Sequence, residues 1–172
     1  MSAVCDAGPL IALGRLGQLD LLLKLHSEVV VASEVYHEVV TEGVRIGAAD
    51  AAAVDLLVRN RRIQVVAVPL PAPLPDWAGA IDPGEVATII LAQQRPSYAV
   101  LIDDAHARQA ARSVGLTPKG TVGLLLQGFR SGHLSAEEFA LLMEGIKAEP
   151  TLWISDSLCD EALRRVRHGL TD

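Results

Sequence analysis

Short apolar runs alternate with helical patterns along the chain. Four runs rich in Val and Ile are bounded by turn or capping residues, and we predict strands there, at residues 2–6, 28–32, 62–68 and 98–102. Because these runs show little polar alternation, the strands are expected to be buried on both faces, as in a parallel sheet between helices. The pattern predicts an α/β fold, a three-layer sandwich with a small central parallel sheet flanked by helices.

Helical patterns fill the intervals between the predicted strands. The expected helices cover residues 18–26, 33–40, 48–60, 82–94 and 105–115. From about residue 133 to 172 the pattern is helical again, and Ser135 and Glu138 stand at the spacing of a capping box. Segment 68–83 carries five prolines and is expected to be an irregular surface connection. We expect residues 1–172 to form a single domain.

Composition narrows the class of protein. Half of the 172 residues are apolar, which is enough for a core without disulfide support. Two distant cysteines predict neither a disulfide framework nor a zinc knuckle, and no signal or membrane-spanning segment is recognisable. We therefore expect a cytoplasmic protein with no membrane association. The net charge of −6 argues against a nucleic-acid coat protein, but it leaves a nucleic-acid enzyme whose negative charge is concentrated at a metal site.

Acidic residues follow two predicted strands and lie in two helices. Asp6 ends the first strand, Asp103 and Asp104 follow the fourth, and Glu38 and Glu85 lie in helical segments. Ligands of open parallel sheets bind at the carboxyl ends of the strands. Two carboxylates about 4 Å apart repel by about 4 kcal/mol at an effective dielectric constant near 20, so a cluster of them calls for a cation. Oxygen donors without cysteine or zinc-spaced histidine favour Mg²⁺ or Mn²⁺.

Most of these acids also have a purely structural interpretation. Asp6 is followed by Gly8-Pro9 and could be a turn or capping residue. Glu85 stands at capping-box spacing from the residue that precedes its helix. Asp103 could cap the following helix and leave Asp104 as a favourable charge near the helix N-terminus. A cap and a metal ligand are compatible roles, so both interpretations stay open.

Glu38 is one of three glutamates on a predicted helix. Glu34, Glu38 and Glu42 are spaced i, i+4 and i+8, a pattern that usually marks a solvated face. Periodicity does not distinguish Glu38 from the other two.

Several cations are candidates for binding a phosphate chain. Arg108 and Arg112 stand at i and i+4 after the acidic pair and share a helix face, although a solvated face is the alternative. Lys119 and the cluster at 59–62 are further candidates. The chain has two Trp, two Tyr and two Phe, so we expect recognition of the nucleic-acid backbone and shape rather than base stacking.

Five ordered motifs resemble the PIN-domain nucleases. They are VCDAGPLIALGRLGQLDLL, EVVVASEVYHEVV, DPGEVATIILAQQ, VLIDDAHARQAARSVGL and GTVGLLLQGFRSG. The bacterial and archaeal branch similar to the VapC toxins of toxin–antitoxin pairs also ends in a segment like LWISDSLCDEALRR. The resemblance covers nearly the whole chain, and it implies the PIN-like fold and a Mg²⁺- or Mn²⁺-dependent endoribonuclease that cleaves RNA.

The resemblance also implies roles for individual residues. The acids that would hold the metal and act in catalysis are Asp6, Glu38, Glu85, Asp103 and Asp104. Thr121 matches a hydroxyl near the acidic cleft and is a candidate substrate contact, with a helix cap as the alternative. Where the family often carries a hydroxyl after the first aspartate, Ala7 and Gly8 leave only backbone donors. A small antitoxin and a homodimer are the implied protein partners. The competing interpretation is a PIN fold that only binds RNA or protein, with weak or no cleavage.

Overall fold

Five parallel strands form the centre of the molecule. The computed structural model describes residues 1–79 and 81–169. The strands are β1 (Ser2–Cys5), β2 (Glu28–Ala32), β3 (Ile63–Val66), β4 (Ala99–Leu101) and β5 (Pro118–Lys119). They are ordered β3-β2-β1-β4-β5, and every neighbouring pair is parallel. The predicted α/β fold with a small parallel sheet is confirmed; β5, with two residues, is too short to leave an apolar run in the sequence.

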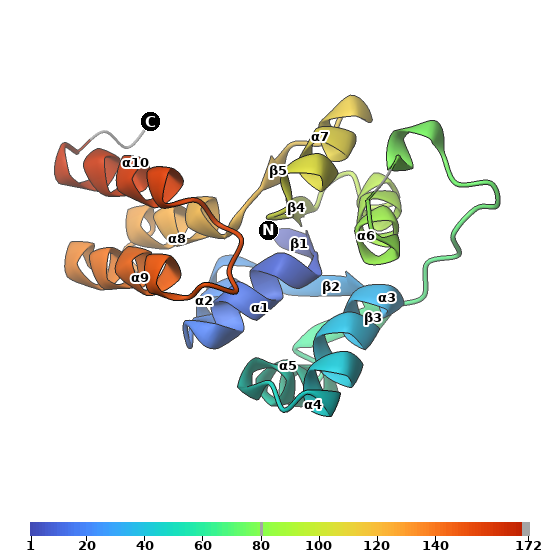
Figure 1. Cartoon of the computed structure of the whole chain (residues 1–172), viewed down its shortest axis with the longest axis horizontal. Coiled ribbons are helices and arrows are strands. Elements are labelled where there is room, and N and C mark those ends of the chain that lie inside the picture. Colours follow the sequence, from blue (N-terminus) through green and yellow to red (C-terminus); the bar gives the residue numbers. More distant parts are fainter. Residues whose placement is uncertain (80, 170–172) are drawn as a thin grey trace.

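Helices fill the connections between these strands (Figure 1). The helical elements are α1 (Ala7–Arg15), α2 (Leu19–Leu25), α3 (Ser33–Tyr36), the π-helix η1 (His37–Glu42), α4 (Gly43–Arg45), α5 (Ala49–Arg59), the 3-10 turn η2 (Asp76–Ala78), α6 (Pro83–Gln93), α7 (Ala105–Ser113), α8 (Thr121–Arg130), α9 (Ala136–Ala148) and α10 (Asp156–Arg167). The helices predicted at 18–26, 48–60, 82–94 and 105–115 correspond to α2, α5, α6 and α7.

The connections place helices on both faces of the sheet. Right-handed crossovers that lead outward from β1 to β2 and β3 put α1, α2 and α5 on one face. The chain then returns across the sheet to β4 and β5, so α6 and α7 cover the other face, where α6 packs against β1 and β2. Figure 1 shows α6 and α7 on one side of the strands and α1 and α5 on the other, which is the three-layer arrangement.

The last three helices gather at one end of the molecule (Figure 1). Phe139 of α9 is fully buried, and the hydrophobic cluster that begins in β1 continues to Leu163 of α10. The predicted capping box at the start of α9 is confirmed: the Ser135 N–H donates to Glu138 at 2.7 Å, and the Glu138 N–H donates to the Ser135 hydroxyl at 3.1 Å. Residues 170–172 of the predicted C-terminal segment and residue 80 of the predicted loop lie outside the described residues.

The structure differs from the prediction in three places. Gln64 and Val65 of β3 are exposed rather than buried, because β3 is an edge strand. The chain turns into α1 directly after Asp6, where the sequence pattern suggested only a turn or cap. The predicted helix at 33–40 is divided into α3 and the π-helix η1.

Across the described ranges, every helix is too short or too polar to traverse a bilayer.

Candidate functional site

A cavity lined by acidic residues opens at the carboxyl edge of the sheet. The strand order reverses direction between β1 and β4, and ligands of open α/β sheets bind at such a point. The cavity there has a volume of about 300 Å³. Six carboxylates line it: Asp6, Glu38, Asp82, Glu85, Asp103 and Asp104. The structure therefore brings together all five acids that the sequence pointed to, and it adds Asp82.

Asp6 is buried at the point where β1 passes into α1. It occupies the N-cap position of α1, yet its side chain makes no capping hydrogen bond. The Thr88 hydroxyl of α6 instead donates to Asp6 Oδ1 at 3.0 Å. Burial raises the pKa of Asp6 to about 7; the Thr88 and Ala7 hydrogen bonds lower it, whereas Glu85 and Glu38 raise it. The backbone donor expected next to the Ala7-Gly8 pair is thus present, and capping does not explain Asp6.

The neighbouring aspartates after β4 have different surroundings. Asp104 is exposed and caps α7, where its Oδ1 accepts the Ala107 N–H at 2.8 Å. Asp103 is half-buried; its Oδ1 accepts the Thr121 N–H at 2.7 Å and its Oδ2 accepts the Thr121 hydroxyl at 2.5 Å. Burial raises the pKa of Asp103, while Thr121 and Arg108 lower it. The capping alternative therefore applies to Asp104 and not to Asp103.

A glycine leaves the space that Asp103 occupies. A Cβ atom on Gly120 would lie 2.8 Å from Asp103 Oδ1, closer than nonbonded atoms approach. Gly120 directly precedes α8, whose first residue holds both oxygens of Asp103. A side chain at position 120 would therefore displace the carboxylate from its two donors.

Glu38 is the member of the glutamate stripe that faces the cavity. It lies in the π-helix η1, and such local widening of a helix is frequent at functional sites. Its Oε2 lies 3.3 Å from the place where a Cβ of Gly84 would be, so the carboxylate packs against the start of α6. Although the residue as a whole is exposed, desolvation there and the charge of Asp82 raise the pKa of Glu38. Glu42 instead pairs with Arg45 at 2.8 Å, away from the cavity.

Glu85 both starts a helix and lines the cavity. Its Oε2 accepts the Asp82 N–H at 2.9 Å, so Glu85 does take part in a capping box, as one interpretation of the sequence predicted. Burial raises the pKa of Glu85, the Asp82 N–H lowers it, and the charges of Asp104, Asp82 and Glu38 raise it. The residue therefore belongs to the acidic cluster as well as to the first turn of α6.

The donor set suits a hard divalent cation. The acidic side chains on the cavity wall are all carboxylates, and Arg15, the only cation on this wall among the residues that the structure describes, already pairs with Asp50 and Glu149 at 3.7 Å each. Within the described ranges, no three His, Cys, Asp or Glu side chains are arranged so that they could hold a metal ion together, and several of these carboxylates accept hydrogen bonds from neighbouring groups. The raised pKa values of Asp6, Glu38, Glu85 and Asp103 show an excess of negative charge and burial that a bound cation would offset.

The structure places two of the predicted substrate contacts, Thr121 and Lys119, away from the open surface of the cavity. Thr121 is fully buried behind Asp103, so it positions that carboxylate and is closed to a substrate. The ammonium of Lys119 hydrogen-bonds Gln127, further along α8, and Lys119 lines neither the acidic cavity nor the groove beside it. The short strand β5 directs this side chain along α8 rather than toward the carboxylates.

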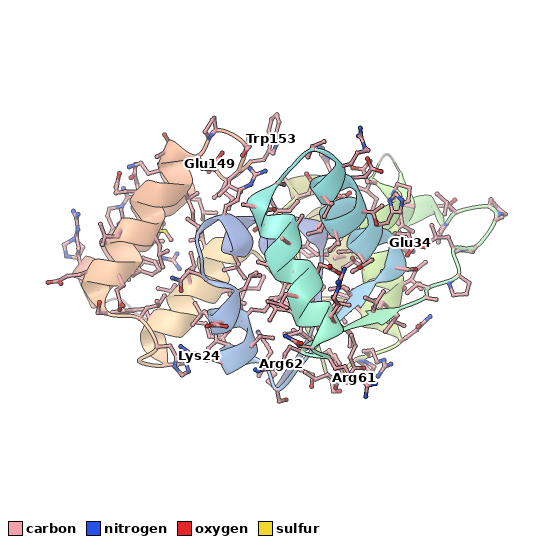
Figure 2. All side chains as sticks on the ribbon, turned by 90° about the horizontal axis from the view of Figure 1, so that it is seen from below. Lys24, Glu34, Arg61, Arg62, Glu149 and Trp153 are labelled. Atoms are coloured by element: carbon pink, nitrogen blue, oxygen red, sulfur yellow. The ribbon has the colours of Figure 1, made fainter. Side chains whose placement is uncertain are left out.

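The arginines divide between supporting and accessible positions. Arg108 donates from Nη1 to the Asp103 carbonyl at 2.5 Å, so it braces the acidic pair. Arg112 is exposed on α7 and lines the groove beside the cavity. Arg61 and Arg62, from the basic cluster at 59–62, lie at the edge of the molecule opposite Trp153 (Figure 2). That cluster is therefore remote from the cavity, whose wall includes Trp153.

Besides Asp82, sequence reasoning missed three residues in or beside the cavity, namely Thr88, Arg15 and Trp153. Thr88 follows Glu85 by three residues on a helix, and this one-turn spacing could have indicated a shared face. Arg15 gave no signal, because a lone arginine at the end of a helix is common. Trp153 lines the cavity although its side chain is 97% exposed, and one tryptophan in a loop carries no pattern.

Comparison with known proteins identifies the family. The family model DUF3368, described as a PIN domain, matches residues 2–168. Searches among curated proteins and among solved structures give no significant match. PIN domains are in general metal-dependent nucleases, so the match supports nuclease-type hydrolase chemistry at the level of the class. With nearly its whole length matched, this chain belongs to the PIN-domain family.

Proposed function

We propose that this protein is an endoribonuclease that hydrolyses RNA phosphodiester bonds with Mg²⁺ or Mn²⁺. The observation that carries the proposal is the convergence of acids from β1, η1, α6 and the end of β4 on one cavity. The residues that would hold the ion are Asp6, Glu38, Glu85 and Asp103 or Asp104. Carboxylate oxygens are the ligands that these hard cations prefer.

The surrounding residues keep the carboxylates in place. When bound, the cation supplies a water of lowered pKa and an electrostatic partner for the charge that develops on the phosphate. Thr88 and Thr121 donate hydroxyl hydrogen bonds to Asp6 and Asp103, and such outer contacts orient metal ligands. Arg108 braces the backbone of Asp103. No side chain is required as a nucleophile.

We further propose that the protein is a VapC-like toxin that acts as one domain over residues 1–172. The ordered motifs that resemble the VapC branch support this role. It entails a small antitoxin that covers the acidic cavity, and a homodimer of the toxin itself. A basic antitoxin side chain would be attracted by the six carboxylates of the cavity.

The test is RNA cleavage by the purified protein. A mixed RNA pool is incubated with and without Mn²⁺, beside the Asp6→Asn variant and the Asp20→Asn control, which changes an exposed aspartate of α2. We expect cleavage that requires Mn²⁺, is lost in Asp6→Asn and is retained in Asp20→Asn. Equal degradation by all three proteins would identify a contaminating nuclease, and RNA binding without cleavage would favour the binding-module alternative.

A further inference from the structure

A groove runs from the acidic cavity between α7, α8 and α10. It has a volume of about 630 Å³. Asp103, Asp104, Trp153 and Ile154 line both the groove and the acidic cavity, so the two hollows are continuous. A chain molecule that reaches the carboxylates can therefore extend into the groove without leaving the surface.

The groove differs from the acidic cavity in carrying three arginines, Arg108, Arg112 and Arg165, which face the three acids Asp103, Asp104 and Glu161 on its walls. His106, Arg112 and Arg165 are exposed on its walls. Arg112 has no ion-pair partner among the described residues, while Arg165 uses Nε to pair with Glu161 at 3.1 Å and keeps a side chain that is 46% exposed. In a chain with a net charge of −6, this local gathering of accessible guanidinium groups suits a phosphate chain.

Trp153 stands at the junction of the groove and the cavity. It projects outward from the loop between α9 and α10 (Figure 2), and 97% of its side chain is exposed. Its neighbours are anchored, because Leu152 is buried and Ile154 packs against the hydrophobic core. The Ile154 N–H also donates to the Leu152 carbonyl at 2.8 Å. The indole therefore presents a solvent-exposed aromatic face, and the residues directly before and after Trp153 in the chain anchor it to the core.

We propose that Trp153 is a stacking platform for one base of a single-stranded RNA substrate, and that Arg112 and Arg165 bind the phosphates that flank this base. This inference rests on the proposed function, because it concerns the same substrate at the same site. Aromatic faces next to basic grooves bind single strands by stacking, and bases inside a duplex do not offer a free face. The sequence predicted recognition of the backbone and shape rather than base stacking, and this proposal adds a single stacking platform to it.

The fluorescence of Trp153 provides a direct test. Trp77 is the other tryptophan of the chain, and Trp77→Phe leaves Trp153 as the sole tryptophan, whose emission is excited selectively at a wavelength that tyrosine does not absorb. Binding is measured in EDTA, so that the measurement does not depend on cleavage. We expect a single-stranded oligonucleotide of about ten nucleotides to quench the emission, and the same sequence as a duplex to quench it far less. Absence of quenching by any oligonucleotide would overturn the proposal and leave Trp153 as a contact for a protein partner.

Substitutions separate stacking from phosphate binding. Trp153→Ala is expected to weaken single-strand binding about 5- to 150-fold, whereas Trp153→Phe retains part of the affinity. Leu141→Ala, at a 72% exposed side chain of α9 away from the groove, is the matched control and is expected to bind normally. Arg112→Gln and Arg165→Gln are each expected to reduce the slope of log affinity against log salt by about 0.7. Unchanged affinity in Trp153→Ala would refute the platform.

Cleavage kinetics distinguish failure of this inference from failure of the proposed function. If Mn²⁺-dependent cleavage occurs and Trp153→Ala leaves KM unchanged, the nuclease function stands and the stacking site is refuted. If cleavage is absent but single strands still quench Trp153, the binding site stands and the proposed hydrolysis fails.

Discussion

Replacement of Asp6 by Asn is expected to stabilise the metal-free protein at neutral and alkaline pH. The side chain is 4% exposed, and its pKa rises from 3.8 to about 7. Each pKa unit corresponds to about 1.36 kcal/mol, so the buried charge lowers the free energy of unfolding by up to about 4 kcal/mol. Asn keeps an acceptor for Thr88 but loses one of the two carboxylate acceptors, which costs about 1 kcal/mol. The expected net gain is about 3 kcal/mol.

The sign of the effect follows from the two protonation equilibria. Below about pH 4, Asp6 binds a proton in both the folded and the unfolded state, and its charge does not oppose folding. Between about pH 4 and pH 7 only the folded state holds the proton, so the stability of the wild-type protein falls as the pH rises. Above about pH 7 the loss is complete. Glu38, Glu85 and Asp103 have pKa values raised in the same direction and steepen the decline.

Urea denaturation in EDTA at a series of pH values measures this difference. The gain in Asp6→Asn should be near zero at about pH 4 and largest at about pH 8, whereas Asp20→Asn should follow the wild type. Addition of Mn²⁺ at about 100 times its dissociation constant should then stabilise the wild type by about 2.7 kcal/mol and leave Asp6→Asn nearly unaffected. An Asp6→Asn variant that is no more stable than wild type at about pH 8 would refute the account of a buried, uncompensated charge.

Three further predictions test the supports of the site and the core. Gly120→Ala should abolish Mn²⁺-dependent cleavage, because its Cβ would lie 2.8 Å from Asp103 Oδ1. Gly123→Ala is the control: its Cβ would lie 2.8 Å from the side chain of Lys119, which is flexible, and this variant should remain active. Thr121→Val removes the hydroxyl donor and should weaken Mn²⁺ binding about 10- to 100-fold in calorimetric titration; unchanged affinity would contradict the positioning role. Phe139→Ala empties a fully buried site and should lower the free energy of unfolding by about 3–5 kcal/mol in urea, while a change below about 1 kcal/mol would show that the helices α8–α10 pack loosely.

Much of the fold could be predicted because its signals are local. The apolar run at 28–32 coincides with β2, and the Ser135–Glu138 spacing marked the start of α9. The helix α1 is local and was still not predicted, but two other differences from the prediction depend on distant partners. β5 exists because residues 118–119 pair with β4, and β3 is partly exposed because it lies at the sheet edge. The hydrophobicity of residues 118–119 and of β3 does not by itself indicate either feature.

Part of the candidate site could likewise be predicted from the sequence, and part of it could not. The order of motifs and the positions of Asp6 and Asp103 after strands indicated acids at one edge of the sheet, and the structure places them around one cavity. Periodicity did not distinguish Glu38 from its helical neighbours, and only the resemblance to the family motifs selected it; the structure places Glu38 in the π-helix η1 and on the cavity wall. Thr121 was predicted as a substrate contact because it matches a hydroxyl that lies near the acidic cleft in the family that the motifs resemble. Only the packing of α8 shows that the Thr121 hydroxyl already donates its hydrogen bond to Asp103.

The two buried carboxylates depend on separate parts of the fold. Asp6 receives its hydroxyl from α6, which packs on β1 and β2, while Asp103 receives both bonds from the first residue of α8, which packs on α1 and α2. The pairing of Cys5 with Leu101 sets the relative height of the strands from which these aspartates emerge. A slip of one residue would turn Asp103 to the other face of the sheet and away from the α8 donors. Under the proposed function, the register of β4 on β1 therefore determines whether Asp6 and Asp103 lie close enough to share one cation, because α6 donates to Asp6 and α8 donates to Asp103.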